Sequence, residues 1–170
     1  MANEKYPVTP AIRALRSASI SFEPHLYEYL ERGGTAHSAQ ELSVSEHSVV
    51  KTLVLEDEHK RPLLMLMHGD REVALGVLAR IIGVKKVVPC DAAAAQKHTG
   101  YLFGGTSPFG TRVALPVYVE ETVLSLPLIY INGGKRGFLV SLAPTTLISL
   151  LSAKPVQAAV PKDADGNASR

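Results

Sequence analysis

The sequence has only one cysteine, Cys90, among its 170 residues. A single thiol excludes an intrachain disulfide, and the composition leans toward a reducing compartment such as the cytosol. The chain also lacks a run of about 18 apolar residues, which a membrane-spanning helix would need. Its first residues, Met1 to Lys5, are polar and do not form the apolar segment of a signal peptide. We therefore expect a cytoplasmic protein without a membrane span.

Neither sign of charge dominates the chain. Its 18 basic and 16 acidic residues leave a formal net charge of +2. Proteins that coat long nucleic acids carry a strong basic excess, so this balance argues against that class. A small positive patch can still hold a few phosphates. With 46% hydrophobic and 20% charged residues, the composition is that of an ordinary globular protein.

Helical and extended segments alternate irregularly along the chain. Helices are predicted at residues 10–18, 38–42, 72–82, 92–99 and 144–153. Strands are predicted at residues 20–22, 26–29, 49–55, 62–67, 84–88, 115–120, 128–132 and 138–142. Because there is no regular βαβ rhythm, the pattern favours a mixed α+β fold over a doubly wound sheet. Residues 1–160 are expected to form one domain, and the polar residues 161–170 a disordered tail.

Lys51 is the most informative single residue, because it interrupts an apolar strand. On a strand it would share a face with Val49, Leu53 and Leu55. Burying an ammonium costs several kcal/mol unless a partner compensates. Lys51 could therefore line a cavity that accepts an anion or a carbonyl oxygen. It could equally be an edge-strand charge that prevents aggregation, and the residues alone leave both interpretations open.

Two glycine-rich segments are further candidates for a binding site. Residues 104–110 read Gly-Gly-Thr-Ser-Pro-Phe-Gly, and free backbone N–H groups in such a loop can bind an oxyanion or an ester carbonyl. The loop matches neither the P-loop nor the serine-hydrolase elbow, because Pro108 follows Ser107. Residues 133–137, Gly-Gly-Lys-Arg-Gly, would present two cations to a phosphate. Each segment could instead be a purely structural turn.

No other pattern in the sequence indicates a catalytic group. The six histidines are scattered without a paired metal-ligand spacing, so we expect neither a metal nor a cofactor. Cys90 precedes a predicted helix, where a thiolate would be favoured, but a lone cysteine there is more often a small buried apolar residue. No Ser-His-Asp or Cys-His set is apparent.

Four segments, taken in order, resemble the YbaK/EbsC family and the related prolyl-tRNA editing domains. They are Thr9-Pro10-Ala11, Val50-Lys51-Thr52-Leu53, Thr99-Gly100-Tyr101-Leu102 with the loop 104–110, and residues 130–137. The resemblance covers residues 9–155. It implies an α+β fold with a mixed β-barrel or a strongly curved mixed sheet surrounded by short helices.

The resemblance also implies an activity and a set of site residues. Members of this family remove wrong amino acids from tRNA, commonly cysteine or alanine from the proline tRNA, and the Ser-Pro form of the loop leans toward the cysteine branch. The resemblance implies catalytic roles for Lys51, Gly104, Gly105 and Ser107. It implies substrate-binding roles for Phe22, Tyr27, Thr52, Tyr101, Thr106, Pro108, Gly110, Gly133, Gly134, Lys135 and Arg136.

In the implied reaction, the thiol of the mischarged cysteine attacks its own ester and expels tRNA, so the protein only orients the ester and stabilises the oxyanion. The expected partners are the aminoacylated 3′ end of tRNA and a prolyl-tRNA synthetase, with a monomer as the default. Two alternatives stay open. One is a deacylase for alanine or another amino acid that uses water, and the other is a non-catalytic module that binds tRNA or a synthetase.

Overall fold

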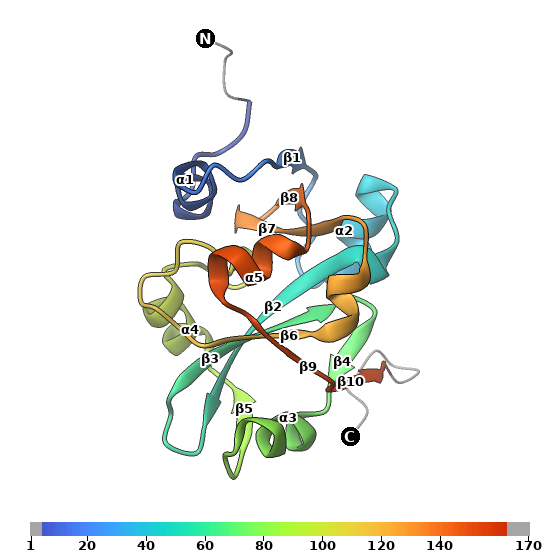
Figure 1. Cartoon of the computed structure of the whole chain (residues 1–170). Coiled ribbons are helices and arrows are strands. Elements are labelled where there is room, and N and C mark those ends of the chain that lie inside the picture. Colours follow the sequence, from blue (N-terminus) through green and yellow to red (C-terminus); the bar gives the residue numbers. More distant parts are fainter. Residues whose placement is uncertain (1–4, 163–170) are drawn as a thin grey trace.

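The computed structural model describes residues 5–162. Its main sheet has eight strands in the order β1-β8-β7-β2-β3-β6-β9, with β5 also paired to β2 (Figure 1). These strands are β1 (Glu23–Leu26), β2 (Val49–Asp57), β3 (Pro62–His68), β5 (Val87–Pro89), β6 (Val117–Glu120), β7 (Ile129–Lys135), β8 (Phe138–Leu142) and β9 (Lys154–Val156). Parallel and antiparallel pairs are combined, so the predicted mixed α+β sheet is confirmed. The order of the described strands is an open path, and they do not close into the barrel that was the other predicted form.

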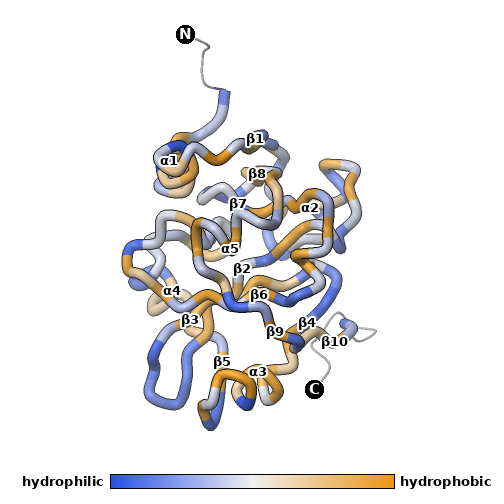
Figure 2. Tube along the Cα trace, in the orientation of Figure 1, coloured by the Kyte–Doolittle hydropathy of each residue, from blue (hydrophilic) through white to orange (hydrophobic). Residues whose placement is uncertain are grey.

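The β2–β3 hairpin is the centre of the sheet. Its register runs from Val50 opposite His68 to Glu56 opposite Pro62. The turn between the strands is the hydrophilic loop visible in blue in Figure 2. There the Asp57 carboxylate accepts from the N–H of His59 at 2.8 Å and from the Arg61 side chain at 2.7 Å. The sequence predicts this hairpin because two apolar runs flank one polar stretch.

The other edge of β2 changes partners along its length. Val49 and Val50 pair with β7 in parallel, whereas residues 55–57 pair with β5 in antiparallel. Between these pairings, residues 51–53 have no strand partner on this edge among residues 5–162. This gap in the sheet positions the site described below.

Two apolar clusters lie on opposite faces of the sheet. The first holds Val50, Leu64 and Ile131, with α1 (Pro10–Ser17) and α5 (Thr145–Leu151) packed on it. The second holds Leu55 and Met65 under α3 (Leu75–Ile82). Because strand side chains alternate between faces, this arrangement puts Thr52 toward the first cluster and Lys51 toward the second. The remaining helical elements are α2 (Gly34–Leu42), α4 (Ala92–Thr99) and the short 3-10 turns η1 (Glu46–Ser48) and η2 (Glu121–Ser125).

Local sequence explains the helix boundaries. At the start of α1, Thr9 Oγ1 accepts the N–H of Ile12 at 3.1 Å, and Pro10 occupies the first helical position. Asp91 caps α4 in the same way, through the N–H of Ala94 at 2.7 Å. None of the helices formed by residues 5–162 combines the length and the apolar character needed to cross a membrane.

Several sequence expectations differ from the structure. The strands predicted at residues 20–22 and 26–29 are replaced by one strand between them, β1 (Glu23–Leu26), which pairs with β8. The helix predicted at residues 72–82 begins only at Leu75, because Arg71–Val73 is strand β4, which pairs with β10 (Ala159–Pro161). The helix predicted from Ser38 begins earlier, at Gly34. The expected tail, residues 161–170, lies largely outside the described residues, but Pro161 ends β10 and Lys162 Nζ lies 3.1 Å from Glu46 Oε2.

Candidate active site

A cavity of about 910 Å³ opens at the gap beside β2. Its floor is β2 from Val49 to Leu55. One wall comes from α2 and the segment before it, and another from the loop after α4. Polar lining residues include Tyr27, Tyr29, Thr35, Ser38, Lys51, Thr52, Glu72, Thr106, Asn132 and Lys162. The cavity therefore joins segments from both ends of the chain around Lys51.

Lys51 lies inside the cavity and is paired with a carboxylate. Its Nζ is 3.3 Å from Glu72 Oε1, and the two side chains are 18% and 20% exposed. Burial lowers the pKa of Lys51 below its ordinary value, and the Glu72 carboxylate opposes that shift. The structure thus places Lys51 as a cavity-lining cation rather than as a solvated edge charge. An ammonium in such a site can stabilise negative charge that develops on a bound group.

A second ion pair lies close to the first. Lys162 Nζ is 3.1 Å from Glu46 Oε2, and Thr35 Oγ1 donates to the same carboxylate at 2.7 Å. Both Lys162 and Glu46 are near enough to Lys51 to influence its pKa. Two lysines and two carboxylates therefore lie in or beside this part of the cavity, and their charges balance.

The glycine-rich loop brings Gly104 and Thr106 to the cavity wall. The N–H of Gly105 is already engaged, because it donates to the Leu102 carbonyl at 2.9 Å. The N–H groups of Gly104 and Thr106 have no protein acceptor among residues 5–162. Gly105 packs so closely on the turn at Lys135 that an added Cβ would lie 2.8 Å from the Arg136 nitrogen. The loop and the turn at 133–137 are therefore in direct contact.

Asn132 organises the turn at residues 133–137. Its side-chain oxygen accepts the N–H groups of Gly134 at 2.6 Å and Lys135 at 3.1 Å. Its amide nitrogen donates to the Gly104 carbonyl at 3.2 Å. Lys135 and Arg136 are exposed, and Gly133 is buried against Phe138. One amide side chain thus ties together the two segments that the sequence singled out separately.

Only part of the predicted site set lines this cavity. Lys51, Tyr27, Thr52, Gly104 and Thr106 do so. The other members lie in the core, on the turn or around a smaller cavity. They are Phe22, Tyr101, Gly105, Ser107, Pro108, Gly110, Gly133, Gly134, Lys135 and Arg136.

Ser107 and Tyr101 support the loop from inside the core. Ser107 is fully buried, and its Oγ accepts the N–H of Phe109 at 3.2 Å. The Tyr101 hydroxyl donates to the Phe109 carbonyl at 2.6 Å. Phe109 itself is completely buried. These contacts anchor the end of the loop that lies away from Gly104.

Sequence reasoning missed several polar members of the site, among them Glu72, Lys162 and Asn132. Glu72 lies within a segment predicted to be helical, Lys162 within the expected tail, and Asn132 within a common hairpin signal. Nothing in the sequence places Glu72 or Lys162 near Lys51, because β4 and β10 meet only through long-range pairing. Asn132 precedes two glycines, and this turn signal was the only indication in the sequence that its side chain would bond the following backbone.

Cys90 lies in the cavity wall but is a poor nucleophile. Its Sγ donates to Glu56 Oε2 at 3.7 Å. Burial, together with the nearby Glu56 carboxylate, raises the pKa of the Cys90 thiol to about 11. Since the thiolate is the reactive form, the thiol is inert at neutral pH.

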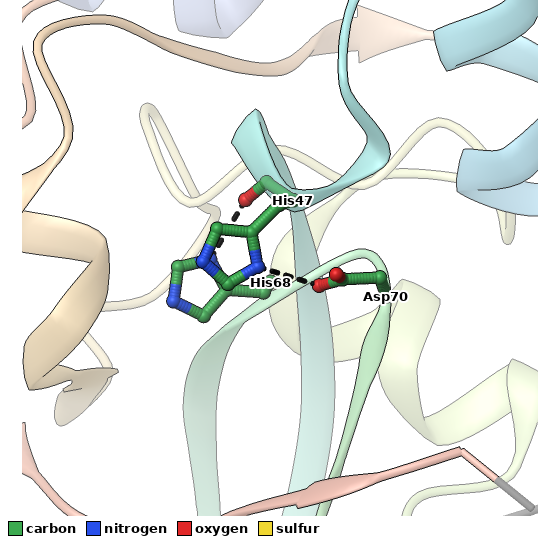
Figure 3. A group of neighbouring side chains, drawn as sticks. All are labelled: His47, His68 and Asp70. Carbon is green, nitrogen blue, oxygen red and sulfur yellow. Dashed lines mark hydrogen bonds and ion pairs between the residues drawn. The ribbon is translucent and has the colours of Figure 1, made fainter.

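His47, His68 and Asp70 form a separate cluster next to the start of β2 (Figure 3). The two imidazole rings are stacked with centroids 3.7 Å apart and planes only 8° from parallel. Ring-nitrogen lone pairs lie in the ring plane, so two stacked rings do not aim at one ion. His68 Nδ1 faces the His47 carbonyl at 2.7 Å, and His47 Nδ1 faces Asp70 at 2.8 Å. The cluster is therefore built as a hydrogen-bonded connection between η1 and β3.

The buried His68 predicts a pH-dependent stability. Burial is the main cause that lowers the pKa of His68. The hydrogen bond to the His47 backbone and the Asp70 carboxylate oppose this shift, whereas the charges of His47 and Arg71 add to it. A histidine whose pKa is lowered by folding stabilises the protein fully above its unfolded pKa, and this contribution is lost as the pH falls toward the folded pKa. We expect the free energy of unfolding to fall below about pH 6.5, by at most about 1.4 kcal/mol per pH unit.

Urea unfolding measured between neutral pH and about pH 5 tests this expectation. The control is His68→Asn, which keeps a donor for the His47 carbonyl but cannot titrate. This variant should be less stable at neutral pH and should lose much of the pH dependence in this range. An equal pH dependence in both proteins would assign the effect to other groups.

The sequence is similar to that of known proteins. A family model described as an aminoacyl-tRNA editing domain matches residues 33–150. EbsC of Enterococcus faecalis, to which Cys-tRNA(Pro)/Cys-tRNA(Cys) deacylase activity is ascribed, is 30% identical over 143 residues, covering 84% of this chain and 87% of EbsC. A proline–tRNA ligase of Desulfotalea psychrophila is 30% identical over 99 residues, which cover 57% of this chain and 16% of the ligase.

The fold is also found among solved structures. One, to which a trans-editing role for prolyl-tRNA synthetase is ascribed, matches with a TM-score of 0.76 and 23% identity. The match covers 89% of this chain and 98% of that one. At this identity the match to the solved structure establishes only the fold, whereas the family model and the similarity to EbsC establish the family. The chain belongs to the aminoacyl-tRNA editing domain family.

Proposed function

We propose that this chain is a trans-editing deacylase that releases cysteine from mischarged tRNA(Pro). The observation that carries the proposal is the cavity of about 910 Å³ with the paired Lys51 at its floor and the glycine-rich loop in its wall. Family membership supports the reaction class, and the activity ascribed to EbsC supports the substrate.

The side chains around the cavity favour a reaction in which the substrate supplies the nucleophile. The Cys90 thiol has a pKa raised to about 11, and Ser107 is buried away from the cavity. An aminoacyl ester is already activated, so orientation and charge stabilisation suffice for its cleavage. The thiol sulfur of the esterified cysteine attacks the ester carbonyl carbon and forms the C–S bond of a cyclic thiolactone. The bond to the ribose oxygen breaks, and that oxygen takes up the thiol proton as tRNA leaves.

The protein contributes positive charge and hydrogen-bond donors to this step. Lys51, held by Glu72, faces the developing oxyanion or the adjacent ribose and phosphate. The N–H groups of Gly104 and Thr106 are the backbone donors that we assign to the same oxyanion, because that of Gly105 is engaged by Leu102. Thr52 Oγ1 is buried without a hydrogen-bond partner among residues 5–162, which leaves one polar atom of the strand beneath the cavity unsatisfied.

A deacylation assay with three forms of tRNA(Pro) tests the proposal. Cysteinyl-, alanyl- and prolyl-tRNA(Pro) are each incubated with the purified protein. We expect rapid loss of cysteine, slow loss of alanine, and no effect on proline. Equal rates for cysteine and alanine would contradict attack by the substrate thiol, because alanine has none, and would indicate that water is the nucleophile. Failure to cleave any of the three would contradict the deacylase function itself.

A further inference from the structure

An aromatic side chain stands exposed at the mouth of the cavity. Phe103 is 77% exposed, more than any other large apolar side chain among residues 5–162. Leu30 is also at the mouth and is 55% exposed. Folding normally removes such surface from water, since burying a phenylalanine side chain is worth about 1.5–3 kcal/mol. Exposed apolar side chains that line the same cavity indicate a surface that is covered when a partner is present.

Arg136 connects Phe103 to a second aromatic ring. Its Nε donates to the Phe103 carbonyl at 2.8 Å, and its guanidinium lies 5.4 Å from the centre of the Tyr29 ring. Tyr29 in turn contacts Gly104, where an added Cβ would lie 2.7 Å from the tyrosine hydroxyl. The hydrogen bond to Arg136 fixes the backbone that carries Phe103. We call Tyr29, Phe103 and Arg136 the aromatic rim.

The composition of the aromatic rim fits single-stranded nucleic acid. Proteins bind unpaired nucleotides by stacking bases on aromatic rings and by placing cations near the phosphates. Arg32 lines the same mouth, and Lys135 is exposed beside Arg136, so three cations are available there. A lipid or an apolar peptide would gain little from these cations. A nucleic-acid strand that delivers a terminal ester to the cavity past Phe103 would lie on this rim.

We propose that Phe103 and Arg136 form a stacking platform for an unpaired base at the 3′ end of the tRNA. The base lies on the Phe103 ring just outside the cavity, and the cations of the rim hold the neighbouring phosphate. The identity of this occupant rests on the proposed function. The platform makes Phe103 a determinant of RNA affinity rather than of the chemical step.

The chain contains no tryptophan, which allows a direct test by fluorescence. Phe103→Trp introduces the single tryptophan of the chain at the rim, and a base stacked on the indole quenches the tryptophan emission. The probe is a short RNA ending in CCA, at low salt. Ile148→Trp, at an exposed position on α5, is the matched control. An abasic oligonucleotide of equal length supplies the same phosphates without bases.

We expect the CCA oligonucleotide to quench Phe103→Trp and to leave Ile148→Trp unchanged, whereas the abasic strand quenches neither. We also expect Phe103→Ala to bind the oligonucleotide about 10-fold or more weakly and to raise KM similarly, with kcat nearly unchanged. Unchanged binding and KM in Phe103→Ala would overturn the platform while wild-type deacylation upheld the function. Quenching of Phe103→Trp by the oligonucleotide, without deacylation by the wild type, would support the platform and contradict the proposed deacylase function.

Discussion

Replacing Lys51 by alanine is expected to lower kcat/KM for cysteinyl-tRNA(Pro) by about 100-fold or more, the usual cost of removing one group that stabilises an oxyanion. The ammonium is held at 3.3 Å from Glu72 in a partly buried setting, where charge interactions are stronger than in water. Its removal would also leave the Glu72 carboxylate unpaired beside the ester. That negative charge would repel the developing oxyanion, so two effects act in the same direction.

Three variants separate these effects in the deacylation assay. Lys51→Ala combined with Glu72→Gln removes both charges and should recover part of the lost activity. Lys51→Arg keeps the charge but changes the geometry and should fall between wild type and Lys51→Ala. Lys154→Ala removes an exposed lysine on β9 and should leave the rate unchanged. Activity in Lys51→Ala close to that of wild type would exclude Lys51 from the mechanism.

The central β2–β3 hairpin was predictable because the sequence pattern that specifies it lies within one short stretch of the chain. Both faces of β2 and β3 are covered by apolar clusters, so the two strands read as apolar runs on either side of a polar turn. Lys51 stood out for the same reason, as a charge inside such a run. What the run could not reveal is that β2 changes partners from β7 to β5 and so opens a gap at Lys51. That gap depends on strands about 35 and 80 residues farther along the chain.

The partners of Lys51 were hidden by the same long-range pairing. Glu72 lies on a strand of three residues that exists because β10 pairs with it. Its neighbours Val73 and Val77 also fit a helical period, so local pattern alone favoured a helix. Lys162 follows β10 directly and reaches Glu46 only because that strand is formed. A sequence pattern cannot report a pairing between short segments that lie almost 90 residues apart.

The glycine loop shows a different limit of the sequence. The glycine-rich composition of residues 104–110 indicated a loop that could be functional or structural, but not which of its residues would reach the cavity. In the structure the loop is attached at both ends. Gly105 lies on the Lys135–Arg136 backbone, and Phe109 is buried in the core. The middle of the loop is therefore structural, and only Gly104 and Thr106 are left to line the cavity.

Gly110, at the far end of this loop, should be the glycine least tolerant of substitution. Its φ is +66°, and an added Cβ would lie 2.5 Å from the Pro10 carbonyl oxygen and 2.6 Å from its carbon. Both are backbone atoms of α1, so no side-chain rotation can relieve the clash. We expect Gly110→Ala to lose about 3 kcal/mol of unfolding free energy, from backbone strain and overpacking together.

Gly83→Ala is the matched control, because Gly83 also has a positive φ of +82° but its added Cβ would meet nothing within 4 Å. Gly83→Ala should lose only about 1 kcal/mol of unfolding free energy, from backbone strain alone, as measured by urea titration of both variants. Gly110→Ala should further reduce deacylation under conditions where it is still folded, because α1 would push the loop and its Gly104 end away from Lys51. Equal losses of stability in the two variants would show that the loop can shift away from α1, and the cavity wall would then not depend on this contact.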